Sequence, residues 1–309
     1  MNWRGFFVAV LLVSMSVLVV GGWALAAPPA QTAPATLAKG GQLYDNWWEA
    51  ARVAEPKGDQ PLWATQSTNT RKGLDTWRCK ECHGWDYKGK DGAYGSGSHK
   101  TGFVGVVDAS KTKTQDQIAA ILKGSSNPNH NFGTVLDDAN INALAAFVKE
   151  GVNPDLTQVV DYATKKPKGA DAAHGKTLYT DTCTACHGAD GAKLNFGTTA
   201  APEFVGTIAV DNPQEFLHKV RFGQPGTGMP TGIQNGWAVK DGVDVLAFAQ
   251  TLSTGKPAAA PVLAPTSAPA ATVLPKTGEP AAWLAMAAPT GFFLLIAGMA
   301  ARKRSRHRG

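Results

Sequence analysis

All four cysteines of this chain fall in two runs of the form Cys-x-x-Cys-His, at residues 79–83 and 183–187. Within one turn of helix, this spacing places two thiols and an imidazole on neighbouring positions. Two such thiols can add across the vinyl groups of a haem while the imidazole reaches the iron from the same side, which is the attachment pattern of haem c. Two local disulfides or two zinc half-sites are alternatives, but neither explains why histidine follows the second cysteine both times. The sequence therefore predicts two covalently bound haem c groups, attached through Cys79, Cys82, Cys183 and Cys186.

The N-terminal segment is typical of a secretory signal peptide. Residues 1–26 combine Arg4, an apolar stretch over 6–20 and the small-residue sequence Ala-Leu-Ala before residue 27,. An uncleaved anchor helix is the alternative. Because haem c is attached outside the cytoplasm, the export signal and the two cysteine motifs agree.

A second targeting segment ends the chain. Residues 274–278 read Leu-Pro-Lys-Thr-Gly and are followed by an apolar stretch over 281–301 and a basic cluster over 302–308. An apolar stretch of roughly 20 residues can span a bilayer, and the basic cluster should stay on the cytoplasmic side. These three parts, in this order, resemble a sortase cell-wall sorting signal, which implies cleavage between Thr277 and Gly278 and transfer to peptidoglycan. A plain membrane anchor is the alternative, and both place the body of the protein outside the cytoplasmic membrane.

The positive charge of the chain belongs to these ends. The formal net charge is +6, but residues 27–277 hold 24 basic against 23 acidic side chains once Arg4, the basic cluster and Glu279 are set aside. Haem propionates would add negative charge to this nearly neutral body. We therefore expect no nucleic-acid partner.

The body repeats itself. Gly-Gly-Gln-Leu-Tyr at 40–44 corresponds to Gly-Lys-Thr-Leu-Tyr at 175–179, a cysteine motif follows in each half, and Phe-Val-Gly comes later, at 103–105 and 204–206. A pair of helices is expected to close each half. The last of these helices is predicted from i, i+3, i+4, i+7 spacing at Ile141, Leu144, Ala145 and Val148, and at Val245, Phe248, Ala249 and Leu252.

The helix before it also has clear boundary signals. In the first half, Thr114 forms a predicted capping box with Gln117, and the apolar stripe ends at Gly124. In the second half, Pro213 opens the matching helix and Gly223 ends it.

A short first helix, a Cys-x-x-Cys-His motif, a loop and a closing helix resemble a class I cytochrome c domain. The resemblance implies an all-α fold in which first and last helices cross beside the haem, with Gly40 and Gly175 allowing close approach. The expected organisation is a signal peptide over 1–26, a first domain over 38–152 with an insertion at about 45–77, a linker over 153–170, a second domain over 171–256, a Pro/Ala-rich stalk over 257–273 and a sorting signal or transmembrane anchor over 274–309.

The halves differ by one insertion. Cys79 lies thirty-five positions after Tyr44, whereas Cys183 lies four positions after Tyr179, so the first half carries thirty-one extra residues. The insertion is rich in tryptophan. These side chains either pack around the first haem or form a docking face for a redox partner.

By motif, His83 and His187 are the proximal ligands, so each sixth ligand must come from elsewhere. Met229 is the one methionine between residues 27 and 277. It lies in the loop between the two closing helices, where the class I family carries its axial methionine. The resemblance therefore implies His187/Met229 ligation in the second half.

The first half has no methionine, and His130 takes the corresponding place. His130 lies six residues after Gly124, as Met229 lies six after Gly223. We therefore expect His83/His130 ligation of the first haem. His99 is the competing ligand or a further near-haem residue.

The two ligand sets predict an electron carrier with a direction. A thioether ligand raises the reduction potential of haem iron, whereas two imidazoles favour the ferric state. Electrons should then pass from the first haem to the second, between a donor and an acceptor protein, and six-coordinate irons leave no catalytic position open. The alternative is a dihaem enzyme with its chemistry at the first haem, either peroxidase-like, using His99 or His130 as acid or base, or oxidising sulfur compounds. The sulfur-oxidising families that resemble this architecture use a free cysteine thiolate, which is absent here.

Overall fold

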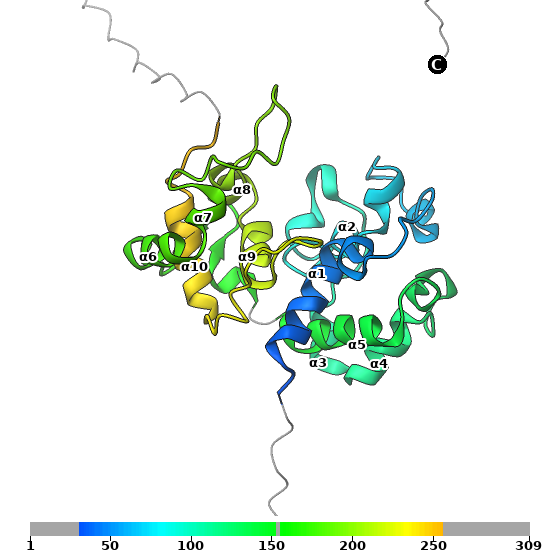
Figure 1. Ribbon diagram of the computed structural model, residues 1–309. Coiled ribbons are helices and arrows are strands. Elements are labelled where there is room, and N and C mark those ends of the chain that lie inside the picture. The colour runs from blue at the N-terminus through cyan, green and yellow to red at the C-terminus, as the bar shows by residue number, and fades with distance from the viewer. Residues whose placement is uncertain (1–30, 153–154, 256–309) are drawn as a thin grey trace, which may run out of the picture. The chain divides into compact units, whose positions relative to one another are not determined.

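Two pairs of packed helices organise the chain. Helix α1 (Pro34–Ala51) packs on α5 (Asp138–Ala146), and α6 (Ala172–Thr182) packs on α10 (Val239–Ala249) (Figure 1). The computed structural model describes residues 31–152 and 155–255, and these belong to one compact unit. We refer to residues 31–152 as the first half and to residues 155–255 as the second half.

The remaining elements are short. The first half adds α2 (Cys79–His83), α3 (Val107–Thr112), α4 (Gln115–Leu122), a π-helical turn η7 (Phe147–Gly151) and the 3-10 helices η1 (Pro61–Thr65), η2 (Gly73–Trp77), η3 (Ala93–Gly95), η4 (Gly97–His99), η5 (Pro128–His130) and η6 (Phe132–Thr134). The second half adds η8 (Leu156–Gln158), β1 (Val160–Asp161), β2 (Lys166–Pro167), α7 (Thr184–His187), α8 (Val205–Asp211) and α9 (Pro213–Phe222). The described residues are therefore mostly helical.

The predicted helix boundaries are confirmed at several points. Thr114 and Gln117 form both hydrogen bonds of the capping box at the start of α4, at 2.9 and 3.2 Å. Helix α9 begins at Pro213 and ends at Gly223, whose φ of 86° is accessible to glycine at little cost,. Helix α5 begins after Asp137, whose carboxylate accepts a hydrogen bond from the backbone of Asn140.

The two predicted helix-crossing glycines stand at the contacts of the two helix pairs. A Cβ on Gly40 would overlap the carbonyl oxygen of Ala143 in α5, and a Cβ on Gly175 would overlap that of Asp244 in α10. Both helix pairs therefore approach so closely that only hydrogen fits at these positions.

The tyrosines that end the repeated pentapeptides are also equivalent. The hydroxyl of Tyr44 donates to the carbonyl of Gly84 at 2.6 Å, and that of Tyr179 donates to the carbonyl of Gly188 at 2.9 Å. Each acceptor is the residue directly after a motif histidine. The first helix of each half is thus tied to its cysteine motif in the same way.

The later Phe-Val-Gly repeat is not equivalent in structure. The amide of Val106 donates to Tyr87, and the amide of Val205 donates to Gly191. Because each acceptor lies four residues after a motif histidine, Val205 corresponds to Val106 rather than to Val104. The two triplets are therefore offset by two residues.

The insertion begins at a kink. Asn46 has φ −150° and ψ 95° inside α1, and its side chain accepts a hydrogen bond from the amide of Glu49 at 3.1 Å. Asn46 therefore ends one helical segment and caps the next. The chain then continues through η1 and η2 to Cys79, so the kink lies next to residue 45, where the insertion is predicted to begin.

The described part of the expected linker is packed rather than extended. Residues 160–161 and 166–167 form a two-stranded antiparallel ladder. Leu156 and Val160 are buried within the same core cluster that contains Phe147 of the first half and Leu217 of the second. The all-α expectation therefore needs this small hairpin added, and the two halves share one core.

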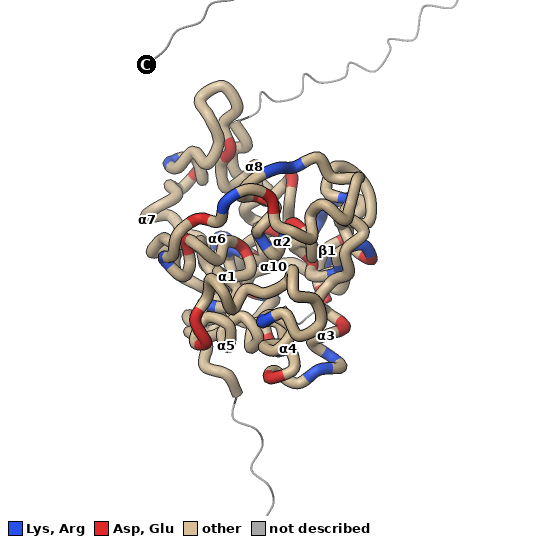
Figure 2. The backbone as a smooth tube through the Cα atoms, turned by 90° about the vertical axis from the view of Figure 1, so that its right-hand side faces the viewer, with Lys and Arg blue, Asp and Glu red and all other residues tan. Residues whose placement is uncertain are grey.

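Several expectations lie outside the described residues. These are the signal peptide over 1–26, the stalk over 257–273 and the sorting signal or anchor over 274–309, with Thr277 and Gly278. Among the helices of the described ranges, none has the length and apolar character needed to cross a membrane. Figure 2 shows basic and acidic positions interspersed along the described chain.

Candidate haem sites

Each cysteine motif forms a short helix that presents its functional groups on one side. At about 100° per residue, the first cysteine, second cysteine and histidine of α2 fall within one face of the helix. In the second half, α7 ends at His187 in the same way, with Cys183 as its N-cap. All four cysteines are free, so the two local disulfides are not formed.

Burial raises the pKa of Cys79 and Cys82 to about 12 and that of Cys183 to about 11, so the free thiols are protonated at neutral pH. A zinc half-site still does not explain the histidine that follows the second cysteine in both motifs.

The first half brings the rings of its two predicted axial histidines close together, with their planes 81° apart. The ring centroids of His83 and His130 lie 6.3 Å apart. Two imidazoles that bind one metal from opposite sides, each with a metal–nitrogen bond of about 2 Å, have centroids roughly 6 Å apart. The observed separation therefore fits a single iron between the two rings.

The hydrogen bonds of these rings orient the correct nitrogens. Nδ1 of His83 lies 2.6 Å from the carbonyl oxygen of Val104, and Nδ1 of His130 lies 3.4 Å from that of Ile121. A carbonyl accepts only, so both Nδ1 atoms carry protons and both Nε2 atoms keep a lone pair for a metal. Burial lowers the pKa of His83, to about 4, and that of His130, which keeps both rings neutral.

The insertion braces the loop that carries His130. Gln60 donates from Nε2 to the carbonyl of Asn129 at 2.7 Å. The rings of Trp47 and Trp77 pack edge-on against Phe132, whose ring centroid is 5.1 Å from that of His130. The insertion thus supports the loop from beside His130.

The tryptophans themselves are largely inside the protein. Trp47, Trp48, Trp63 and Trp85 are buried, and Trp77 is half-buried. Their burial favours packing around the first haem over an exposed docking face.

His99 occupies a different place. Its Nδ1 lies 2.8 Å from Nη1 of Arg71 and 3.8 Å from Oε2 of Glu81, and its ring stacks on Tyr94 at 4.5 Å. Glu81 projects from the side of α2 opposite to Cys79 and His83. These contacts favour His130 over His99 as the residue that faces His83.

Two large apolar side chains that follow the second motif in sequence are exposed. Leu194 and Phe196 are 43% and 49% exposed, and the Phe196 ring lies 5.8 Å from His187. Nδ1 of His187 is buried and has no hydrogen-bond partner among the described residues. Exposed large apolar side chains beside a cysteine motif fit a flat apolar group that covers them, so the residues present fit haem c.

Met229 lies in the loop between α9 and α10, where the sequence places it. The side chain is half-buried, and its backbone amide donates to Oγ1 of Thr227 at 3.3 Å. Its role opposite His187 stays a prediction.

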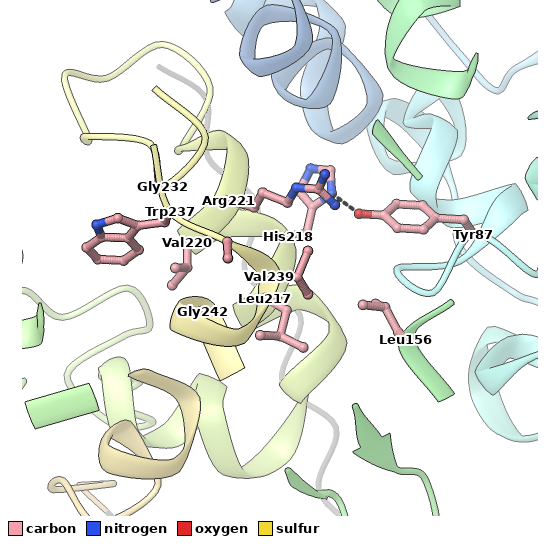
Figure 3. Close-up of a pocket in the computed structure, with 11 residues that line it drawn as sticks. Tyr87, Leu156, Leu217, His218, Val220, Arg221, Gly232, Trp237, Val239 and Gly242 are labelled. Atoms are coloured by element: carbon pink, nitrogen blue, oxygen red, sulfur yellow. Dashed lines mark hydrogen bonds between the residues drawn. The ribbon is translucent and has the colours of Figure 1, made fainter. Parts of the chain in front are cut away.

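His218 is an important residue that the sequence patterns did not single out. It is fully buried where the halves meet, with Nδ1 2.8 Å from the hydroxyl of Tyr87 and Nε2 3.0 Å from the carbonyl of Gly41 (Figure 3). Burial lowers its pKa to about 3, so the ring is neutral. Nε2 therefore donates to Gly41 and Nδ1 accepts from Tyr87. The sequence carries no signal for this residue, because His218 follows Leu217 in a helix whose apolar residues have ordinary amphipathic spacing.

A cavity of about 30 Å³ adjoins this histidine, lined by side chains of both halves, among them Tyr87, Leu156 and Arg221 (Figure 3). The volume is that of a single water molecule. This cavity is too small for a substrate.

His174, Asp241 and Asp244 form another polar cluster, with ligand-type atoms within 4.8 Å of one another. Both oxygens of Asp244 accept hydrogen bonds from Lys240, and one also accepts from the amide of Asp171. Asp244 is thus satisfied as the residue that holds the start of α6 against α10.

Comparison with known proteins agrees with this reading of the second half. Residues 170–247 match the family described as Cytochrome C oxidase, cbb3-type, subunit III. The match places a cytochrome c domain in the second half, and domains of this kind bind haem c covalently.

A curated relative is the gluconate 2-dehydrogenase cytochrome c subunit of Pantoea cypripedii, 30% identical over 159 residues. The aligned region covers 48% of this chain and 32% of that protein, so the chain spans about a third of the relative's length. No solved structure matches the chain.

Proposed function

We propose that this protein is an exported c-type cytochrome with two haems that transfers electrons between a donor and an acceptor protein. Cys79 and Cys82 would hold one haem with His83 and His130 as axial ligands. Cys183 and Cys186 would hold the other with His187 and Met229. When bound, each haem supplies one-electron exchange between ferric and ferrous iron.

The observation that carries the proposal is the close pair His83 and His130, whose ring centroids lie 6.3 Å apart. Each ring is held by a hydrogen bond from Nδ1 to a backbone carbonyl, so each Nε2 keeps its lone pair for a metal,. An iron held from both sides has no position for a substrate. This geometry supports a carrier rather than an enzyme with chemistry at the first site.

The ligand sets also support a direction. Two neutral imidazoles favour ferric iron, and a Met229 thioether favours ferrous iron. The first half is then the lower-potential site and the second half the higher-potential site. The buried contacts between the halves keep the two sites in one compact unit.

The partners and location follow from the targeting segments and the relative. The relative is the cytochrome c subunit of a dehydrogenase, so a dehydrogenase is the proposed electron donor. The protein would act outside the cytoplasmic membrane, held by residues 274–309 either in the membrane or, after cleavage between Thr277 and Gly278, on peptidoglycan. The near-neutral body does not favour a nucleic acid as partner.

Spectroscopy of the purified full-length protein tests the proposal. We expect two covalent haems per chain, both low-spin in the ferric state, and no rapid binding of carbon monoxide to the reduced protein. A redox titration should give the lower potential to the bis-histidine signal. Rapid carbon monoxide binding at the first site would instead favour the dihaem enzyme, and the reverse order of potentials would contradict the direction.

A further inference from the structure

We propose that α1 of the first half is a positioning element for Met229 in the second half: Gln42 and Glu49 hold the loop over residues 223–232 in its ligand-bearing conformation. The inference rests on the proposed His187/Met229 ligation. It adds that the strength of this ligation depends on a helix that belongs to the other half.

The contact begins at the end of α9. Gln42 donates from Nε2 to the carbonyl of Phe222 at 3.0 Å, and this carbonyl is the last of the helix. Gly41 lies so close to Phe222 that a Cβ at this position would overlap the aromatic ring. The backbone is therefore fixed by α1 at the residue where the loop starts.

A charged residue on the same face of α1 extends this contact. Asp45 is one turn after Gly41 and is fully buried, and it pairs with both Lys219 of α9 and Arg78. Lys219 also donates to Oε1 of Gln224 in the loop at 2.5 Å. This chain of contacts ties the second residue of the loop to α1.

Beyond the kink at Asn46, Glu49 meets the middle of the loop. A Cβ on Gly226 would lie 2.9 Å from Oε2 of Glu49, and Gly226 has a φ of 73°. At Gly223, with a φ of 86°, a Cβ would lie 3.1 Å from both Gln42 Nε2 and the carbonyl oxygen of Met229. The loop therefore turns sharply at two glycines, and α1 lies against both turns.

Around Met229 the loop has few ties of its own. The hydroxyl of Thr227 donates to the carbonyl of Gln224 at 3.0 Å and accepts from the amide of Met229 at 3.3 Å, and at the far end the amide of Gly232 donates to the carbonyl of Val220 in α9 at 2.8 Å. Between these anchored ends, opening the loop and releasing the sulfur would break only the hydrogen bonds of Thr227. With α1 in place, opening must also disturb the contacts of Gln42 and Glu49 at the start of the loop.

The test uses full-length holoprotein and imidazole, which replaces a methionine ligand when its loop opens. The readout is the weak red absorption band of ferric iron bonded to methionine sulfur. We expect Gln42→Ala to lower the imidazole concentration that displaces half of this band roughly fivefold, the equilibrium value of one hydrogen bond. Glu49→Ala should act in the same direction, and the bis-histidine signal of the first half should not change in either variant.

Gln250→Ala is the matched control, because Gln250 also donates its amide to a backbone carbonyl, that of Ala209, but within the second half. An unchanged imidazole midpoint in both Gln42→Ala and Glu49→Ala, or an equal shift in Gln250→Ala, would overturn the inference. Should Gln42→Ala not fold, the exposed Glu49 carries the test alone.

Amide hydrogen exchange of residues 223–232 separates this inference from the proposed ligand set. A wild-type protein without the methionine band would contradict Met229 ligation. Faster exchange of the loop in Gln42→Ala would still support bracing by α1, and unchanged exchange would contradict it.

Discussion

The two halves hold their cysteine motifs in the same frame, which consists of the first helix, the motif and the closing helix. They differ in how they support the loops that carry His130 and Met229. In both, a tyrosine of the first helix binds the glycine after the motif, and a glycine admits the closing helix. The loop of His130 is braced by the insertion of its own half, through Gln60. The second half has no insertion, and Gln42 in α1 of the first half instead binds the carbonyl of Phe222, directly before the loop of Met229.

This difference shows that the contacts that hold the cysteine motif and those that hold the loop of His130 or Met229 are independent of each other. Short local contacts fix where each motif histidine stands. The proposed sixth ligands lie on loops, and a loop needs support from outside these local contacts. In the first half the insertion supports the loop of His130, and in the second half α1 of the first half supports the loop of Met229.

The largest effect should come from removing one motif at a time. Replacing Cys79 and Cys82 with alanine should abolish covalent attachment at the first site and halve the haem content per chain. Replacing Cys183 and Cys186 should do the same at the second site. Haem quantitation and intact mass measure the loss, and an unchanged content in either pair would break the assignment of one haem to each half.

Replacement of the facing histidine should change the spin state without haem loss. In His130→Ala the first iron loses its sixth ligand, so we expect a high-spin ferric signal at that site only, measured by electron paramagnetic resonance. His99→Ala is the control and should leave the first site low-spin, because His99 binds Arg71 and Glu81 rather than facing His83. The opposite result in this pair of variants would exchange the roles of the two histidines.

Because both halves share the glycine contact between their first and last helices, we expect similar losses of stability in both. Gly40→Ala and Gly175→Ala each push a Cβ into a carbonyl of the crossing helix, so we expect a loss of about 2 kcal/mol or more in the free energy of unfolding. Gly242→Ala in α10 is the control, because its Cβ would meet nothing closer than 3.8 Å. Removing a helical glycine there should be neutral or stabilising by up to about 1 kcal/mol. Urea unfolding of the three variants measures the contrast.

The smallest effect concerns the contact between the halves and depends on pH. Burial is the largest cause that lowers the pKa of His218 from 6.5 to about 3, with Lys219 and Arg221 acting in the same direction and Asp45 and the Gly41 carbonyl opposing. The unfolded chain therefore binds an extra proton between these values, and stability falls as pH drops from about 6.5 toward 3, by up to about 1.4 kcal/mol per pH unit. Above pH 6.5 this contribution is constant.

His218→Gln removes the titrating group. The variant should therefore lose less stability than the wild-type protein between pH 7 and pH 4.5, measured by urea unfolding at each pH. Equal pH dependence in the two proteins would show that His218 does not titrate with unfolding.

Much of the frame could be read from the sequence because its signals are local. The capping box at Thr114 and the glycine that ends α9 depend on sequence neighbours, whereas the crossing of helices at Gly40 and Gly175 followed from the resemblance to a class I cytochrome c domain. The Phe-Val-Gly repeat suggested an alignment of the two halves that is wrong by two residues, because a short apolar triplet does not define the register of a loop. His218 was missed, because a buried polar side chain has no sequence pattern of its own.

By itself, the sequence determined the two cysteine motifs with their histidines and the corresponding places of His130 and Met229 after Gly124 and Gly223. It also predicted the targeting segments, which lie outside the described residues. Each of these depends on a short run of residues or on spacing along the chain. Only the tertiary structure decided that His130 rather than His99 faces His83, that the tryptophans are largely buried and that α1 lies against the Met229 loop. These are contacts between residues far apart in the chain, and they depend on how helices cross and which side chains the crossing buries.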